Sequence, residues 1–163
     1  MKDAEYLLVD EPRPGALERI VVRPMWPLLG SMLGITLLGW GWFLLNGIGM
    51  GSPTRRAEFG WVVAGVLGGY LILFGALAGL GAAGASGIET QSVFPYMMVA
   101  LLVWKLFVSY RLQLLQRRVY EVYLYYSGDE RSGMVAVIAF YLSSGPLRRL
   151  IPGEAILWLI PLL

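Results

Sequence analysis

The sequence predicts an all-α fold, a polytopic helical membrane protein with three to four transmembrane helices and an amphipathic extension of the third. The 163 residues are 57% hydrophobic and only 15% charged, and the mean hydropathy is +0.64. A soluble domain has about 45–50% apolar and about 25% charged residues, so a soluble core of this size would leave much apolar surface in water. Three long apolar runs are the second observation, because each one is long enough to cross a bilayer core.

The distribution of polar residues divides the chain into three regions. Residues 1–24 form a polar N-terminal tail, and residues 25–150 form the transmembrane helical domain. Residues 151–163 form an apolar C-terminal tail. This tail is too short to cross a bilayer alone, so we expect it to be interfacial or re-entrant.

The first apolar run extends from Met25 to about Gly47, and we expect it to form one membrane-spanning helix. Trp40 and Trp42 lie toward its far end, where aromatic side chains typically occupy the membrane interface. Asn46 precedes a glycine, and we expect this residue to end the helix.

The second run extends from Phe59 to about Ala83, and a small-residue loop from Gly84 to Ser92 follows it. The third run begins at Val93. Neither proline nor glycine interrupts residues 96–126, and apolar residues recur there at three- and four-residue spacing. The sequence therefore predicts one long helix from about Val93 to Tyr126 that protrudes from the membrane.

The region after residue 119 has two interpretations. Val119–Tyr126 and Met134–Leu142 are rich in β-branched and aromatic residues and flank a polar turn, a pattern typical of a β-hairpin. Alternatively, Ser132–Leu147 is a fourth, short membrane helix of about 24 Å. We favour the helix, because a lone hairpin leaves unpaired backbone groups in lipid.

Small residues recur at four-residue spacing in the first two runs, which allows helix backbones to approach closely in lipid. In the second run they share one face, which another helix should cover. We favour the first run of the same chain as that helix over a second chain. The helix-packing candidates are Gly30, Gly34, Ala64, Gly68, Gly75 and Gly79.

Basic and aromatic residues near the ends of the runs are candidates for contact with lipid headgroups or with a partner. Lys105 is the only charged residue within the predicted third span, and its long side chain can reach toward the arginine-rich end. No acidic residue lies within a predicted span. The full set of candidates is Lys105, Arg117, Arg118, Tyr120, Tyr123, Arg148 and Arg149.

The distribution of basic residues does not decide the orientation by itself. If residues 48–58 and 111–131 face the cytoplasm, six basic residues lie on each side of the membrane. The loop from Gly84 to Ser92 has no Lys or Arg, which favours placing it outside. With four spans, both termini then lie outside as well.

The absence of two residue types excludes several classes of chemistry. The chain has no cysteine and no histidine, which excludes disulfides, thiolate metal sites, imidazole ligands and Ser-His or Cys-His catalytic couples. The net charge of +2 comes without a basic stripe, so we expect no nucleic-acid binding. We assign no catalytic, cofactor-binding or metal-binding residue.

These observations favour a non-catalytic integral membrane protein, a small subunit or an assembly or scaffold factor of a larger membrane complex. A small homo-oligomeric channel or transporter is the alternative, and a membrane-embedded lipid-modifying enzyme is the third hypothesis. The expected partners are the lipid bilayer and a membrane protein or further copies of the chain. Arginine far outnumbers lysine, which is compatible with a GC-rich bacterial genome and hence with a bacterial inner membrane.

Overall fold

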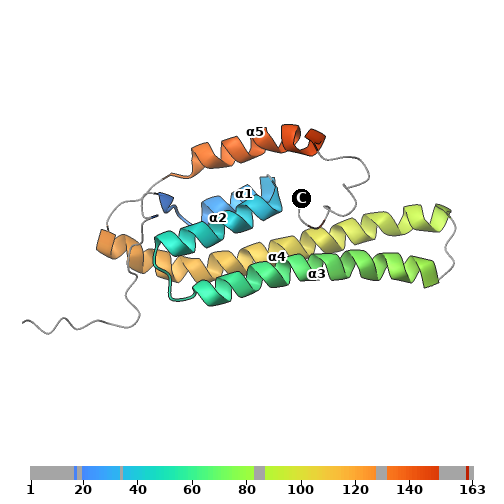
Figure 1. The fold of residues 1–163 in the computed structure, drawn as a ribbon, viewed down its shortest axis with the longest axis horizontal. Coiled ribbons are helices and arrows are strands. Elements are labelled where there is room, and N and C mark those ends of the chain that lie inside the picture. The colour runs from blue at the N-terminus through green and yellow to red at the C-terminus, as the bar shows by residue number, and fades with distance from the viewer. Residues whose placement is uncertain are drawn as a thin grey trace, which may run out of the picture.

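The computed structural model describes residues 17, 20–33, 35–82, 87–127, 132–150 and 161. Side chains within helices are described except at residues 83–92, 127 and 143–150. The described residues form five helices and contain no strand, which confirms the predicted all-α fold (Figure 1). The helices are α1 (Met25–Leu33), α2 (Thr36–Gly49), α3 (Arg55–Ala82), α4 (Gly87–Ser127) and α5 (Met134–Leu150).

Two of these helices, α3 and α4, are long and apolar enough to cross a membrane. The predicted number of three to four transmembrane helices is therefore not confirmed. At about 1.5 Å per residue, α3 is about 42 Å long and α4 is about 62 Å long. Both helices are thus longer than a bilayer core, which is about 30 Å thick.

The first apolar run does not form one helix, and this prediction is wrong. The chain leaves α1 at Leu33, is extended at Ile35, and returns antiparallel in α2. With lengths of about 14 Å and about 21 Å, neither helix alone crosses a bilayer core. The run is therefore a helical hairpin whose two ends lie at the same end of the bundle (Figure 1).

Small side chains explain why the first run folds back on itself. A Cβ atom on Gly39 would lie 2.5 Å from the Cα of Ser31, so no larger residue fits between α1 and α2. Thr36 Oγ1 donates a hydrogen bond to the backbone oxygen of Ser31 (3.4 Å) across the turn. These contacts favour the hairpin, because close backbone approach adds dispersion contact that lipid cannot replace.

The α3 and α4 helices form an antiparallel pair along most of the length of α3 (Figure 1). Trp104 Nε1 on α4 donates a hydrogen bond to the backbone oxygen of Gly65 on α3 (2.9 Å). Trp40 of α2 packs over the same glycine, and a Cβ atom there would lie 2.6 Å from the Trp40 ring. Trp40 and Trp42 are buried, so their predicted interfacial position is wrong.

The predicted long helix is confirmed, because α4 runs without a break from Gly87 to Ser127. It begins inside the predicted loop and contains Pro95. No strand is present at residues 119–126, and residues 134–150 form α5, so the structure supports the helical interpretation over the β-hairpin. The α5 helix packs on α1, where a Cβ atom at Gly30 would lie 3.2 Å from the Phe140 ring.

The described part of the segment before α1, residues 17 and 20–24, packs into the bundle. Val21 and Val22 are buried, and Val21 packs with Met50, Tyr120 and Tyr123 at the end of the bundle where α3 begins. Residues 1–16 lie outside the described part. In the C-terminal tail only Pro161 is described, and it is buried 3.0 Å from a Cβ atom built on Gly69.

Candidate functional site

A buried polar network joins four segments at the end of the bundle where α3 begins, which we call the base. Its three central side chains, Asn46 of α2, Glu58 of α3 and Gln116 of α4, are fully buried. Gln116 Nε2 donates hydrogen bonds to Glu58 Oε2 (2.7 Å) and to the Phe43 backbone oxygen (2.5 Å). Asn46 Nδ2 donates to Gln116 Oε1 (3.1 Å), so the three side chains form one chain of hydrogen bonds.

The turn before α3 and the segment before α1 complete the network. Ser52 Oγ (2.8 Å) and Thr54 Oγ1 (2.7 Å) both donate hydrogen bonds to Glu58 Oε1. The backbone N–H of Val22 donates to Asn46 Oδ1 (2.8 Å). Burying a polar group costs free energy unless it is hydrogen-bonded, so this set of partners explains how a carboxyl group is accommodated inside the bundle.

Sequence reasoning missed this network for two reasons. Glu58 lies one residue before the predicted second run, so it was placed outside the membrane. Asn46 was expected to end the first helix, but α2 continues to Gly49 and the Asn46 side chain points into the core. The available signal was the set of polar residues at Asn46, Glu58 and Gln116, one beside each of three apolar runs.

A second, smaller network lies deeper in the bundle. Ser109 Oγ of α4 accepts hydrogen bonds from Trp40 Nε1 (2.9 Å) and from Ser31 Oγ (3.1 Å). Ser31 and Ser109 are 78 residues apart in the sequence. This network fixes the position of the α1–α2 hairpin against α4.

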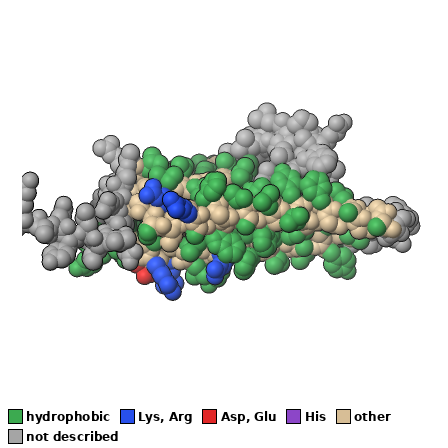
Figure 2. All heavy atoms as spheres, turned by 60° about the horizontal axis from the view of Figure 1, so that its bottom comes forward, with side chains coloured by type: hydrophobic (Ala, Val, Ile, Leu, Met, Phe, Trp, Pro, Cys, Tyr) green, Lys and Arg blue, Asp and Glu red, His purple; other side chains and the backbone are tan. Residues whose placement is uncertain are grey.

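Arginine side chains gather near the base (Figure 2). Three of the arginines with described side chains lie on α4, two begin α3, and one precedes α1: Arg23, Arg55, Arg56, Arg111, Arg117 and Arg118. The rest of the face in Figure 2 is mainly hydrophobic. Residues 48–58 and 111–131 were expected on one side of the membrane, and Glu58 and Gln116 from these two ranges lie at the same end of the bundle, joined by a hydrogen bond. The segment before α1 was expected on the opposite side, but Val22 bonds to Asn46, so this segment lies at the same end of the bundle as those two ranges.

Two grooves flank α4 at this end. One has a volume of about 340 Å³ and lies between the start of α3 and the side chains of Arg111 and Arg118. The other, of about 380 Å³, contains Arg23, Arg117 and Glu121. Arg117 Nε lies 3.1 Å from Glu121 Oε1, so the charge of Arg117 in the second groove is paired with a carboxylate. The lining of the first groove contains no acidic residue.

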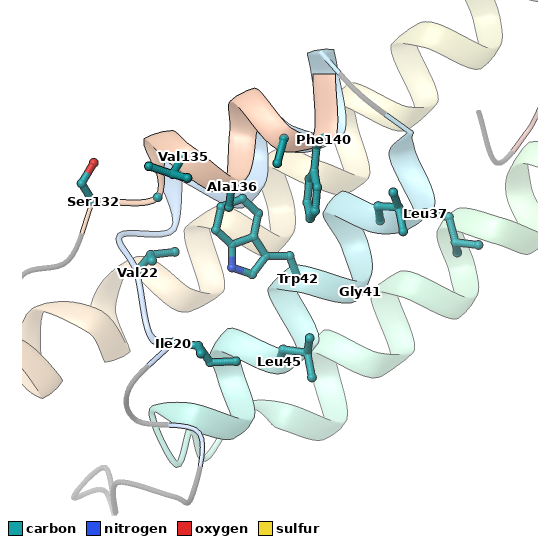
Figure 3. A pocket seen from close by; sticks show the side chains of 13 residues that line it. Ile20, Val22, Leu37, Gly41, Trp42, Leu45, Ser132, Val135, Ala136 and Phe140 are labelled. Carbon is teal, nitrogen blue, oxygen red and sulfur yellow. The ribbon is translucent and has the colours of Figure 1, made fainter. Parts of the chain in front are cut away.

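An apolar groove of about 630 Å³ separates α2 from α5 (Figure 3). The Trp42 ring lies between the two helices and meets Phe140 edge-on, with ring centroids 5.3 Å apart. Leu37, Gly41 and Leu45 form the α2 wall. A bilayer would supply acyl chains to such a surface, so we assign no specific ligand to it.

The predicted helix-packing residues fall into separate environments. Gly30 packs between Phe140 and Trp42, and Gly68 lies against the Trp104 ring of α4. Ala64 is half-buried, and Gly34 lies outside the described residues. The helix that packs against Gly68 is thus α4, and not the first apolar run as expected.

Gly75 and Gly79 are exposed, with no described atom within 4 Å of a Cβ atom built on either. The expectation that the first run of the same chain covers them is wrong. The covered glycine face of α3 is instead that of Gly65 and Gly69, about a quarter turn away. Because α3 has glycines on several faces, the sequence alone does not show which of these faces another helix covers.

The remaining candidates also differ in their surroundings. Tyr120 and Tyr123 are buried in the base, so they do not face lipid or a partner as predicted, whereas Tyr125 and Tyr126 are exposed. Lys105 is half-buried on α4, and Arg118 is exposed. The side chains of residues 148 and 149, Arg148 and Arg149, lie outside the description.

The described residues contain no group of three or more acidic side chains that could hold a metal ion. Comparison with known proteins gives no family, curated relative or solved structure that matches the chain.

Proposed function

We propose that the chain is a non-catalytic integral membrane protein, a small subunit or an assembly factor of a larger membrane complex. The observation that carries this proposal is the distal half of the α3–α4 pair, which extends past the described tips of α1 and α2 (Figure 1). Leu71, Phe74 and Leu77 are exposed there, beside the uncovered Gly75 and Gly79.

This surface fits a partner helix better than lipid. Exposed leucine and phenylalanine side chains pack as well against lipid acyl chains as against a partner helix, so they do not discriminate between the two. Glycine on a lipid-facing surface gives little dispersion contact, whereas a second helix approaches closely at a pair of glycines four residues apart. The excess of arginine over lysine is compatible with a bacterial source, and in a bacterium the membrane of a helical protein would be the inner membrane.

The test is affinity purification of the full chain from its native membranes in a mild detergent, followed by measurement of stoichiometry. Replacing Gly75 and Gly79 with leucine should remove a stoichiometric partner protein. Gly60→Leu is the matched control, because Gly60 is another α3 glycine with no described atom within 4 Å of a built Cβ. A wild-type chain that purifies without any partner would contradict the proposal.

The buried Glu58–Gln116–Asn46 network favours a second candidate, a small homo-oligomeric channel or transporter. Polar groups embedded in a membrane protein frequently mark an ion or substrate pathway. The same purification separates the two candidates, since a pure homo-oligomer supports the second one. Transport in proteoliposomes that is lost in Glu58→Gln would then establish it.

A further inference from the structure

One groove at the base combines two guanidinium groups with apolar walls. Its lining consists of one residue in the turn before α3 and five residues of α4: Thr54, Arg111, Leu114, Leu115, Arg118 and Val119. The lining thus provides positive charge and hydrocarbon in the same groove of about 340 Å³.

The positive charge in this groove is not neutralised by the described acidic side chains. Glu58 is buried and accepts its hydrogen bonds from Ser52, Thr54 and Gln116. Glu121 pairs with Arg117, which lines the other groove. Among the described residues, neither guanidinium of the first groove has a carboxyl partner.

The two arginines lie at different depths along α4. They are seven residues apart, which corresponds to about 10 Å along the helix axis. The Arg111 guanidinium lies 5.1 Å from the centre of the Trp61 ring, so it is held at the level of an aromatic side chain. Arg118 lies near the start of α3, where Arg55 and Arg56 are exposed. The headgroup layer of a leaflet is about 5–7 Å thick, so a lipid phosphate in that layer would lie within reach of long side chains from both levels.

We propose that this groove binds the headgroup of an anionic phospholipid. Arginine matches a phosphate group with two parallel hydrogen bonds, and basic pockets at the membrane surface are suited to such headgroups. Leu114, Leu115 and Val119 contact the glycerol and the first methylene groups. The proposal excludes Arg117, whose charge is paired with Glu121.

The experiment uses the full-length chain, delipidated in a non-ionic detergent and titrated with phosphatidylglycerol or phosphatidylcholine. Native mass spectrometry counts the lipids that remain bound. Arg118→Gln should weaken phosphatidylglycerol binding about fivefold, and Arg111→Gln with Arg118→Gln about 30-fold, from the usual contribution of one basic residue at an anionic surface. Phosphatidylcholine should bind weakly to every variant.

Arg117→Gln is the matched control, because it removes the same charge from the adjacent position on α4. This variant should bind phosphatidylglycerol as the wild type does. The double variant Arg111→Lys with Arg118→Lys keeps the charge but not the two parallel hydrogen bonds, so its loss of binding should be smaller than that of the double Gln variant, which separates loss of charge from loss of fold. Equal losses in Arg117→Gln and Arg118→Gln would overturn the proposal, as would equal binding of both lipids or displacement of the lipid by inorganic phosphate.

Discussion

The base and the distal half of the α3–α4 pair are built by different means. At the base, α2, α3, α4 and the segment before α1 meet around Glu58, and every central polar group has a hydrogen-bond partner. In the distal half, Leu73, Met97 and Leu101 form a narrow apolar contact, and most other side chains of α3 are exposed. Polar groups in a low-dielectric environment require defined partners, whereas apolar groups are satisfied by lipid. The base therefore specifies how the chain folds, and the distal half remains available for association.

The largest expected contrast concerns which residues share a side of the membrane. The chain has no cysteine, so single cysteines at Ile20, Pro53 and Ala82 can be labelled with a membrane-impermeant maleimide. The hairpin predicts that Ile20→Cys and Pro53→Cys react from one side and Ala82→Cys from the other. A single span through residues 25–47 would place Ile20 and Pro53 on opposite sides, and that labelling pattern would refute the hairpin.

The second prediction removes the centre of the base. Glu58→Ala leaves donors on Ser52, Thr54 and Gln116 without their acceptor, so the free energy of unfolding should fall by about 2–3 kcal/mol. Thermal unfolding of the detergent-solubilised chain measures the change. Glu121→Ala is the control, because that exposed residue forms an i,i+4 ion pair worth about 0.5 kcal/mol or less. Similar losses in both variants would show that the network does not stabilise the base.

The third prediction compares two glycines of the same helix. Gly65→Leu places a side chain where the Trp40 ring already lies, so it should destabilise the chain by about 1–3 kcal/mol. Gly75→Leu extends into open space and removes a helix-interior glycine, so it should leave the unfolding temperature of the isolated chain unchanged or raise it slightly. The two variants are distinguished by their unfolding temperatures, which are measured by size-exclusion chromatography of samples heated to increasing temperatures. Equal destabilisation would mean that the distal glycine packs within the same chain.

The sequence was sufficient to predict the elements that depend on local pattern. Composition and apolar runs predict the helical class and the long α4, because neither depends on which segments meet in space. The hairpin in the first run could not be predicted in this way. Its turn depends on the contact between Gly39 and Ser31 and on Ser109 of α4. In the sequence, the run of apolar residues in a helical hairpin looks the same as the run in a single membrane-spanning helix.

The candidate site was less accessible to prediction for a related reason. Charge and aromatic content identified Arg118 but could not show that Arg117 is paired with Glu121. Tyr120 and Tyr125 are equivalent in composition, yet Tyr120 is 4% exposed and Tyr125 is 85% exposed. The helical phase of α4 relative to the base decides between them, and that phase is a tertiary property.

The α1–α2 hairpin has a consequence for the order in which the protein is made. It leaves the ribosome before α3 and α4, yet Ser31 and Trp40 bond to Ser109, and Asn46 bonds to Gln116. These partners are synthesised about 70 residues later. The hairpin therefore cannot complete these contacts until α4 has been made, and its α1 helix is covered by α5 only later still.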